Sequence, residues 1–334
     1  MKNAKLSEPK KVLNEPKKVL GERLKEKEIL APYTTFKIGG PADFFFEAKT
    51  REQLISAVRA SHRLVLPFLV LGGGSNVLVG DRGFRGLVIK NSTSGIVIRA
   101  VRGRWREGRT HGLVYVEADS GVIFNKLVRF TIEEGLGGLE MHLGLPGTVG
   151  GAIYMNSKWT KPVAYVGDVV FQATLIDKNG KLKTVPATYF GFGYDASRIQ
   201  DTGETVVSVT FALKPTPKTK LWETAELSIA YRRQTQPQGV FSPGCTFRNL
   251  TSGEALRIST PNLTTSAGFL LDHAGLKGLM VGQAQISPVH ANFIINKGGA
   301  KARDVLKLIE LSRERVKQKY GIELKEEIVK IGDF

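Results

Sequence analysis

The chain has 334 residues, of which 42% are hydrophobic and 24% charged, and its formal net charge is +17. This length predicts about two domains, with cores large enough to enclose a cleft. The apolar runs are too short for a membrane-spanning helix, so we expect no membrane insertion. The N-terminal residues are charged throughout and lack the apolar core of a signal peptide. Because the chain has a single cysteine, Cys245, it forms no internal disulfide, and we expect a cytoplasmic protein.

The positive charge raises the question of a nucleic-acid partner. Basic residues are spread along the chain, with denser patches at 9–27 and 99–109. Single-strand binding calls for aromatic side chains interleaved with basic ones. The tryptophans, at 105, 159 and 222, form no such stripe. We therefore expect phosphorylated small molecules as ligands and no nucleic acid, with a salt-dependent DNA binder as the alternative from another class.

Residues 1–28 predict a flexible basic extension, because they repeat the segment EPKKVL and contain helix-breaking prolines. The three phenylalanines at 44–46 predict a strand entering a core. A helix is predicted over 50–64, after a threonine cap. Residues 66–79 then predict a strand, a glycine turn and a second strand. This pattern is a strand–helix–strand unit that opens the ordered part of the chain.

The remaining chain predicts a mixture of strands and helices. Short strands are expected over 86–90, 95–101, 112–118, 169–177 and 204–213, with a turn at 179–181. Helices are expected over 123–136, 267–279 and 302–321, the last ending at Gly321. Two prolines in 214–219 mark a linker, residues 290–300 predict a strand and turn, and a short strand closes the chain.

Two glycine-rich loops are candidates for a phosphate-binding site. The first, LGGGSNVLV at 71–79, offers consecutive backbone N–H groups with little side-chain obstruction. It is neither a G-x-G-x-x-G nor a Walker A motif, since Val77 replaces the third glycine and no Gly-Lys-Ser/Thr follows. The second, GLPGTVGGAIYMN at 144–156, adds the hydroxyl of Thr148. Two such loops suit a dinucleotide, and tight turns that pack helix on sheet are the structural alternative.

A family resemblance covers residues 30 to 332. The stretches that carry it are YTTFKIGGPA (33–42), LGGGSNVLV (71–79), GLPGTVGGAIYMN (144–156), GYDASRIQ (193–200), SPGCTFRN (242–249), AGFLLDHAGLKG (267–278), HANFIINKGGA (290–300) and LKEEIVKIG (324–332). With these motifs in this order, the chain resembles UDP-N-acetylenolpyruvoylglucosamine reductase, a flavoenzyme family of bacterial cell-wall precursor synthesis. The lack of long insertions resembles its shorter form.

The resemblance implies an α+β fold. It places an FAD-binding domain of the vanillyl-alcohol-oxidase type at 29–214, with two subdomains divided near residue 90. A C-terminal α+β domain at 215–334 would bind the UDP-sugar, and its final strand would return to the active site. We expect a monomer.

The resemblance also implies the reaction. NADPH reduces non-covalently bound FAD, and hydride then passes to the enolpyruvyl double bond of UDP-N-acetylglucosamine enolpyruvate. A protein acid protonates the adjacent carbon and yields UDP-N-acetylmuramate. The expected FAD-binding residues are Gly72, Gly73, Gly74, Ser75, Asn76, Pro146, Gly147, Thr148 and Gly151. Another flavin oxidoreductase of this fold, or a catalytically impaired homologue, is the alternative.

Cys245 matches the position of the family's proton-donating serine. A thiol with a pKa of about 8.5 is a competent acid. A metal-ligand role is not expected, because no Cys or His partner lies at ligand spacing. A nucleophilic role has no acyl or phosphoryl step to serve. Glu327 matches the family's C-terminal catalytic carboxylate, although a one-residue change of register would select Glu326 instead.

Three further residues are expected to bind substrate: Tyr194, Arg248 and Asn249. The main departure from the family pattern is Asp195, which follows Tyr194 where the family carries an arginine assigned to the enolate and carboxylate. A carboxylate reverses that charge. Arg198 is the first candidate for the missing cation, and Arg232 or Arg233 are the alternatives.

Overall fold

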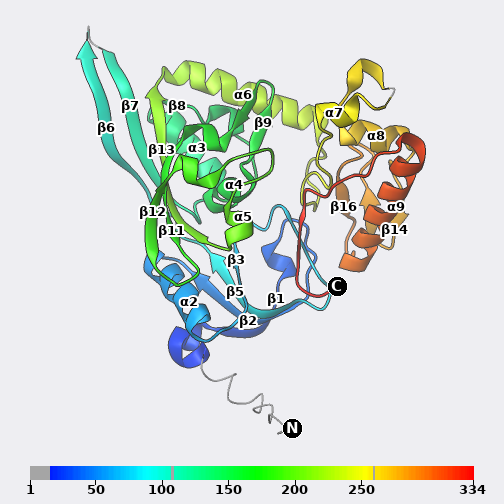
Figure 1. Ribbon diagram of the computed structural model, residues 1–334, viewed down its shortest axis with the longest axis horizontal. Coiled ribbons are helices and arrows are strands. Elements are labelled where there is room, and N and C mark those ends of the chain that lie inside the picture. The colour runs from blue at the N-terminus through cyan, green and yellow to red at the C-terminus, as the bar shows by residue number, and fades with distance from the viewer. Residues whose placement is uncertain (1–15, 107–108, 259) are drawn as a thin grey trace.

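The computed structural model describes residues 16–106, 109–258 and 260–334 (Figure 1). The first copy of the EPKKVL repeat, at 8–13, lies outside these residues, and the basic patch at 99–109 lies partly outside them. Within the described ranges, no helix is both long enough and apolar enough to cross a membrane.

The first part of the fold is a four-stranded sheet covered by α2, drawn in blue and cyan in Figure 1. Its strands, in spatial order, are β1 (Lys25–Ile29), β2 (Pro41–Ala48), β5 (Phe84–Asn91) and β3 (Phe68–Leu71). Helix α2 (Arg51–Arg63) begins as predicted at Thr50, whose side chain accepts the N–H of Gln53. Leu54 and Val58 of α2 pack against Phe44, Phe46 and Leu87.

Residues 1–28 were predicted to form a flexible extension, but the structure orders residues 16–28 of it. Residues 16–20 are helical, η1 (Gly21–Arg23) follows, and β1 pairs antiparallel with β2. Leu24 is buried in the same core as α2. The prediction of flexibility was therefore wrong for residues 16–28, because an edge strand gains a main-chain ladder and one apolar anchor despite its charged composition.

The second part is an antiparallel sheet with helices on one side. Its strands are β12 (Leu182–Pro186), β11 (Val170–Ile176), β13 (Thr205–Pro215), β7 (Arg109–Asp119) and β6 (Ile96–Arg106), with β8 (Leu136–Gly137) also paired to β13. The β6–β7 hairpin projects beyond the sheet in Figure 1. The helices of this part are α3 (Phe124–Glu133), α4 (Val149–Met155), α5 (Ile199–Thr202) and α6 (Lys218–Thr235).

The predicted linker at 214–219 is the junction of two regular elements. Strand β13 runs to Pro215, and α6 begins at Lys218 directly after Pro217. Leu221 and Ala225 of α6 pack into the core of the second part. The sequence analysis missed this helix because its buried positions form only a narrow stripe, so its pattern lacks the broad apolar face of an amphipathic helix.

The third part contains the C-terminal helices and a small antiparallel sheet. Its elements are α7 (Ser252–Ala255), α8 (Ala267–His273), β14 (Met280–Val281), β15 (Ala284–Ile286), β16 (Ile294–Asn296), α9 (Ala302–Tyr320) and β17 (Val329–Ile331). The predicted helix stop is confirmed, since Gly321 caps α9 with a positive φ of 67°. The predicted helix at 267–279 is shorter, because α8 ends at His273.

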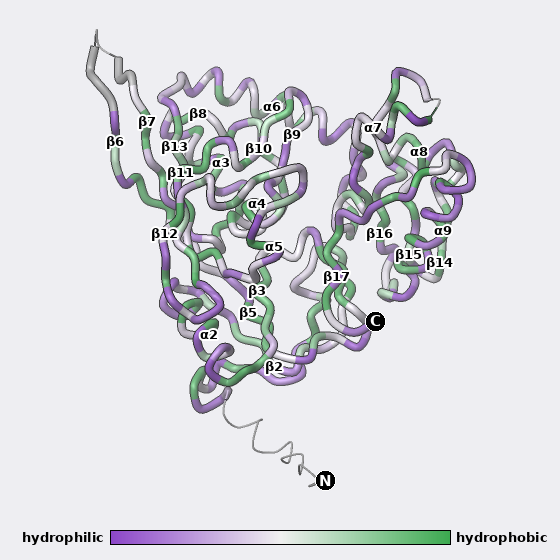
Figure 2. Tube along the Cα trace, viewed as in Figure 1, coloured by the Kyte–Doolittle hydropathy of each residue, from purple (hydrophilic) through white to green (hydrophobic). Residues whose placement is uncertain are grey.

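The chain end returns to the first glycine loop. Strand β17 pairs in parallel with β4 (Val77–Val79), the strand that follows this loop. The predicted pair of strands over 66–79 exists, but β3 and β4 belong to different sheets. Figure 2 shows hydrophobic residues along β5 and β17 inside the molecule. The remaining short elements are η2 (Ala31–Tyr33), η3 (Glu140–His142), β9 (Lys158–Thr160), β10 (Val163–Tyr165), η4 (Val166–Val169), η5 (Ala187–Phe190) and η6 (Pro261–Leu263).

Candidate active site

A cavity of about 1330 Å³ lies between the three parts of the fold. Both glycine loops line it, together with β4, β17 and residues that lead into the C-terminal part. This volume exceeds the roughly 300–1,000 Å³ of a site for one small ligand. The cavity is therefore large enough for a cofactor and a substrate together.

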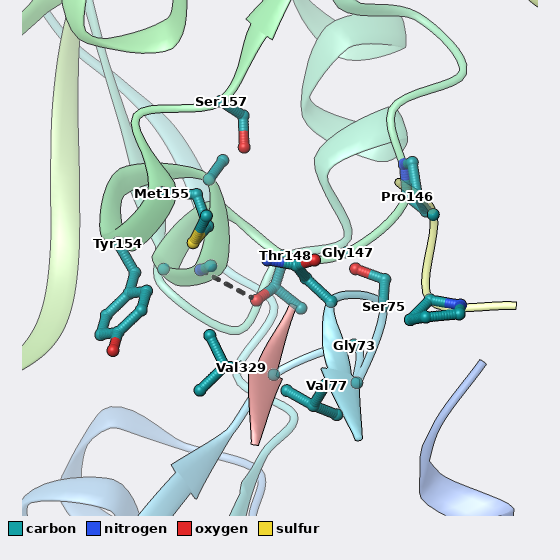
Figure 3. A pocket seen from close by; sticks show the side chains of 18 of the residues that line it. Gly73, Ser75, Val77, Pro146, Gly147, Thr148, Tyr154, Met155, Ser157 and Val329 are labelled. Carbon is teal, nitrogen blue, oxygen red and sulfur yellow. Dashed lines mark hydrogen bonds between the residues drawn. The ribbon is translucent and has the colours of Figure 1, made fainter. Parts of the chain in front are cut away.

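The two glycine loops touch each other at one wall of the cavity. A Cβ on Gly73 would lie 2.7 Å from Cα of Gly147, and a Cβ on Gly72 would lie 2.3 Å from the hydroxyl of Thr148. Figure 3 shows Ser75 and Thr148 beside Gly147 on this wall. Since main chain approaches main chain here, the glycines are required for the contact between the loops as well as for their turns.

The loops leave a set of backbone donors open to the cavity. Within the described part of the chain, the N–H groups of residues 73–76, 147 and 148 donate no hydrogen bond. Neighbouring unsatisfied N–H groups form a nest that binds anions. The loops therefore fit the pyrophosphate of a dinucleotide, and the predicted FAD-binding residues all line the cavity: Gly72, Gly73, Gly74, Ser75, Asn76, Pro146, Gly147, Thr148 and Gly151.

Comparisons with known proteins agree with this geometry. An FAD binding domain model matches residues 42–186, and the model of the UDP-N-acetylenolpyruvoylglucosamine reductase C-terminal domain matches residues 236–331. A UDP-N-acetylenolpyruvoylglucosamine reductase of Protochlamydia amoebophila is 38% identical over 90% of this chain and 91% of its own. The chain belongs to this reductase family. The two matched models place an FAD-binding domain and the family's C-terminal domain in one chain, as the sequence predicts.

Solved structures support the same fold. The family's crystal structure from Thermus caldophilus superposes with a TM-score of 0.71 at 32% identity, covering 92% of this chain and 99% of its own. A VAO-type flavoprotein of Myceliophthora thermophila, at 9% identity, has a TM-score of 0.56 over 95% of this chain and 86% of its own. The predicted α+β fold with a vanillyl-alcohol-oxidase-type FAD domain is confirmed.

Cys245 lies half-buried on the cavity wall. It forms an isolated antiparallel bridge with Phe293, and the N–H of Thr246 donates to the carbonyl of Asn292 at 2.7 Å. Burial raises the pKa of the Cys245 thiol, and the negative charge of Glu327 raises it further. The thiol is therefore protonated at neutral pH and holds a transferable proton.

Glu327 lines the same cavity, where its backbone is held at both ends. Its N–H donates to the carbonyl of Thr246 at 2.8 Å, and its carbonyl accepts from Nδ2 of Asn76 at 3.2 Å. Burial raises the pKa of the Glu327 carboxyl to about 8, and the charge of Asp195 adds to the effect. Glu327 is therefore a neutral carboxylic acid over most of the physiological pH range.

The neighbouring carboxylate, Glu326, has a different environment. Its Oε1 pairs with Arg313 at 2.8 Å and with Lys330 at 3.1 Å, and it does not line the cavity. The structure therefore separates the two glutamates, with Glu327 at the cavity and Glu326 in an ion-pair network.

Asp195 occupies a buried turn beside Tyr194. It has a positive φ of 50° and is 3% exposed, and burial raises the pKa of its carboxyl. Its Oδ2 lies 3.6 Å from Nζ of Lys158, which sits 3.2 Å from the centroid of the Tyr194 ring. The Tyr194 hydroxyl accepts the N–H of Asn249 at 3.0 Å. Lys158, Tyr194, Asp195 and Asn249 therefore form one cluster, and all four line the cavity.

The arginines named from the sequence have different positions. Arg198 is exposed, with its guanidinium 4.8 Å from the Tyr189 ring centroid, and does not line the cavity. Arg232 and Arg233 line it, and Arg232 stacks on Trp159 at 5.0 Å. Arg248 is half-buried behind the cavity wall, and its charge lowers the pKa of Asp195 and Glu327.

The sequence analysis missed Lys158. It lies at the start of β9, two residues after Asn156, whose left-handed conformation ends α4. The sequence signal that could have indicated Lys158 was the short length of α4. Because the chain turns at Asn156 after only seven helical residues, the following segment returns toward the glycine loop that precedes α4. In the described ranges, no group of three His, Cys, Asp or Glu residues could hold a metal ion.

Proposed function

We propose that this chain reduces UDP-N-acetylglucosamine enolpyruvate to UDP-N-acetylmuramate with NADPH, in the synthesis of peptidoglycan precursors. The observation that carries the proposal is the meeting of two protonated acids, Cys245 and Glu327, with the glycine loops around one cavity. Bound FAD would supply hydride transfer from NADPH to the substrate. We further propose a monomer that acts in the cytoplasm, with a FAD-binding domain at 29–214 and a substrate domain at 215–334.

The glycine loops are proposed to bind the FAD pyrophosphate. The open N–H groups of 73–76 and of 147–148 suit a doubly charged phosphate pair without a basic side chain. Thr148 and Ser75 add hydroxyls at the same wall. Because Gly73 and Gly147 are in backbone contact, the two loops would grip the cofactor as one surface.

Cys245 is proposed to be the proton donor. Reduction of the enol ether leaves negative charge on the carbon beside the carboxylate, and this carbon must receive a proton. A thiol with a raised pKa keeps its proton until that charge develops, and a neutral Glu327 avoids placing a second anion beside it. Glu326 is not proposed for this role, because its charge is committed to Arg313 and Lys330.

Tyr194 and Asn249 are proposed to bind the UDP-sugar directly, and Arg248 to assist this binding by its charge. Tyr194 and Asn249 line the cavity next to Cys245 and are joined by a hydrogen bond. Arg248 acts from behind the wall through its charge. Arg198, the cation first expected from the sequence, is not proposed, because it is exposed and outside the cavity.

Two anaerobic half-reactions test the function. The flavin absorbance of the purified protein should bleach with NADPH and return when UDP-N-acetylglucosamine enolpyruvate is added. Addition of UDP-N-acetylglucosamine, which lacks the double bond, is the control and should not restore it. A yellow protein that NADPH bleaches but the enolpyruvyl substrate does not reoxidise would contradict the proposed substrate and identify an impaired homologue.

A further inference from the structure

The proposed reaction needs a cation beside the reacting carbon. When hydride adds to the enolpyruvyl double bond, charge develops next to the carboxylate, and a fixed positive group there stabilises it. Asp195 cannot supply this charge, because its own carboxylate would repel the substrate. The cation must come from another side chain that reaches the cavity near Cys245 and Glu327.

Lys158 has the position and the free donors for this role. Its side chain is only 14% exposed and lines the cavity between Tyr194 and Asp195. Its Nζ is buried and forms no hydrogen bond with the described residues, since the contact to Asp195 is an ion pair at 3.6 Å. An ammonium group carries three donors, so Lys158 can take a second carboxylate while it keeps the first.

The charge of Lys158 acts on the whole acid cluster. It opposes the raised pKa of Cys245, of Glu327 and of Asp195. Lys158 therefore lies close to the proposed proton donor as well as to both carboxyl groups. Its contact with the Tyr194 ring, at 3.2 Å from Nζ to the ring centroid, fixes the ammonium between these groups.

The other cations fit less well. Arg198 and Arg248 do not line the cavity. Arg232 lines it, but its guanidinium stacks on Trp159, and its charge acts on Cys245 and His142. Lys158, by contrast, contacts Asp195 directly through its ammonium group.

We propose that Lys158 binds the enolpyruvyl carboxylate and stabilises the charge that develops beside it, with Asp195 as the positioning residue that holds the ammonium over Tyr194. The inference rests on the proposed function. Lys158 and Asp195 come from two separate segments of the chain, and as a pair they present one positively charged group to the substrate. Asp195 keeps the buried ammonium paired while no substrate is bound, and the substrate carboxylate then becomes its second anion.

A pair of ligands tests the proposal without turnover. UDP-N-acetylmuramate carries the lactyl carboxylate, whereas UDP-N-acetylglucosamine lacks it and is otherwise the same nucleotide sugar. Each is titrated into the FAD-loaded protein, and binding is followed by the shift of the flavin absorbance. Lys158→Met removes the charge and keeps the length of the side chain. Lys161→Met is the matched control, because Lys161 is exposed, packs on Tyr231 at 4.7 Å and does not line the cavity.

We expect Lys158→Met to weaken binding of UDP-N-acetylmuramate about 10- to 100-fold, the usual range for a lost hydrogen bond to a charged group. Binding of UDP-N-acetylglucosamine should stay within about twofold of the parent protein, Lys161→Met should change neither ligand, and Lys158→Arg should recover most of the loss. Equal weakening of both ligands, or no weakening of either, overturns the proposal.

Two controls keep the result interpretable. If Lys158→Met does not retain FAD, Lys158→Gln is used in its place, since its amide is neutral but can still hydrogen-bond Asp195. The parent protein must first reoxidise with the enolpyruvyl substrate. Failure at that step contradicts the proposed function. If the parent reoxidises normally but the Lys158 variants change the binding of both ligands equally, or of neither, only the role of Lys158 is contradicted.

Discussion

The main-chain N–H of Glu327 donates a 2.8 Å hydrogen bond to the carbonyl of Thr246, the residue that follows Cys245. Residues from two distant segments are thereby fixed in register, and the adjoining pair Phe247 and Glu326 forms an antiparallel bridge. Parallel pairing of β17 with β4 extends this register to the first glycine loop. The proposed proton donor Cys245, the buried acid Glu327 and the proposed cofactor loop therefore share one main-chain framework.

Replacement of Cys245 should separate the two half-reactions. In Cys245→Ala, flavin bleaching by NADPH should be unchanged, and reoxidation by the enolpyruvyl substrate should slow about 10²- to 10⁴-fold, as expected for loss of a general acid. Cys245→Ser keeps a proton at the same position and should retain most of the rate. Anaerobic stopped-flow absorbance measures both steps. Equal slowing of bleaching and reoxidation in Cys245→Ala would show a structural role for the thiol.

The pH dependence of reoxidation should report Glu327. With a pKa of about 8, its carboxyl is neutral at pH 7 and ionises above pH 8, where a new anion opposes charge development in the substrate. The reoxidation rate should therefore fall as pH rises through 8. Glu327→Gln removes this titration and should give a flat profile between pH 7 and 9, at a lower rate if the carboxyl proton is itself needed.

The same pKa shift has a consequence for folding. Because burial raises the pKa of Glu327 from 4.5 to about 8, ionisation favours the unfolded chain. The contribution of Glu327 to the free energy of unfolding is complete below pH 4.5 and is lost as pH rises through 8.

For the reoxidation profile, Glu326→Gln is the control. It breaks ion pairs to Arg313 and Lys330, so it should lower stability without removing the pH dependence of reoxidation. A Glu327→Gln profile that still falls above pH 8 would assign the titration to another group.

The sequence predicted those parts of the site that depend on local patterns. The glycine loops, the Thr50 cap and the Gly321 stop are short-range signals, and the structure confirms them as local features. Asp195 was visible as a departure, but its partner Lys158 lies 37 positions earlier and meets it only after α4 turns the chain back. Helix α6 was missed for a similar reason, because its stabilisation comes from packing on a distant core.

The contact between the glycine loops should not tolerate a methyl group. In Gly73→Ala, the new Cβ would lie 2.7 Å from Cα of Gly147, so one loop must shift and open the cofactor wall. We expect the purified variant to lose most of its bound flavin while its far-ultraviolet circular dichroism is retained. Gly253→Ala, whose Cβ would meet nothing within 4 Å, is the matched control and should keep its flavin. Full flavin content in Gly73→Ala would show that the loops adjust.

His142 should make the fold sensitive to acid. It is completely buried next to the second glycine loop, and neither ring nitrogen has a hydrogen-bond partner among the described residues. Burial lowers the pKa of this imidazole from 6.5 to about 4, with a further contribution from the charge of Arg232. Since the folded pKa is depressed, protonation favours the unfolded chain, and stability is lost as pH falls from about 6.5 toward 4.

The size of this effect follows from the two pKa values. Between pH 7 and pH 5, His142 should remove about 2 kcal/mol from the free energy of unfolding. The His142→Leu variant has no imidazole to protonate. Between pH 7 and pH 5, its free energy of unfolding should therefore decrease by about 2 kcal/mol less than that of the parent protein. Urea denaturation at both pH values measures it, and His273→Leu provides the comparison for an exposed histidine at the end of a helix. If His142→Leu and the parent lose equal stability between pH 7 and pH 5, the imidazole is already satisfied by buried water, and the loss must then come from groups whose pKa the fold lowers.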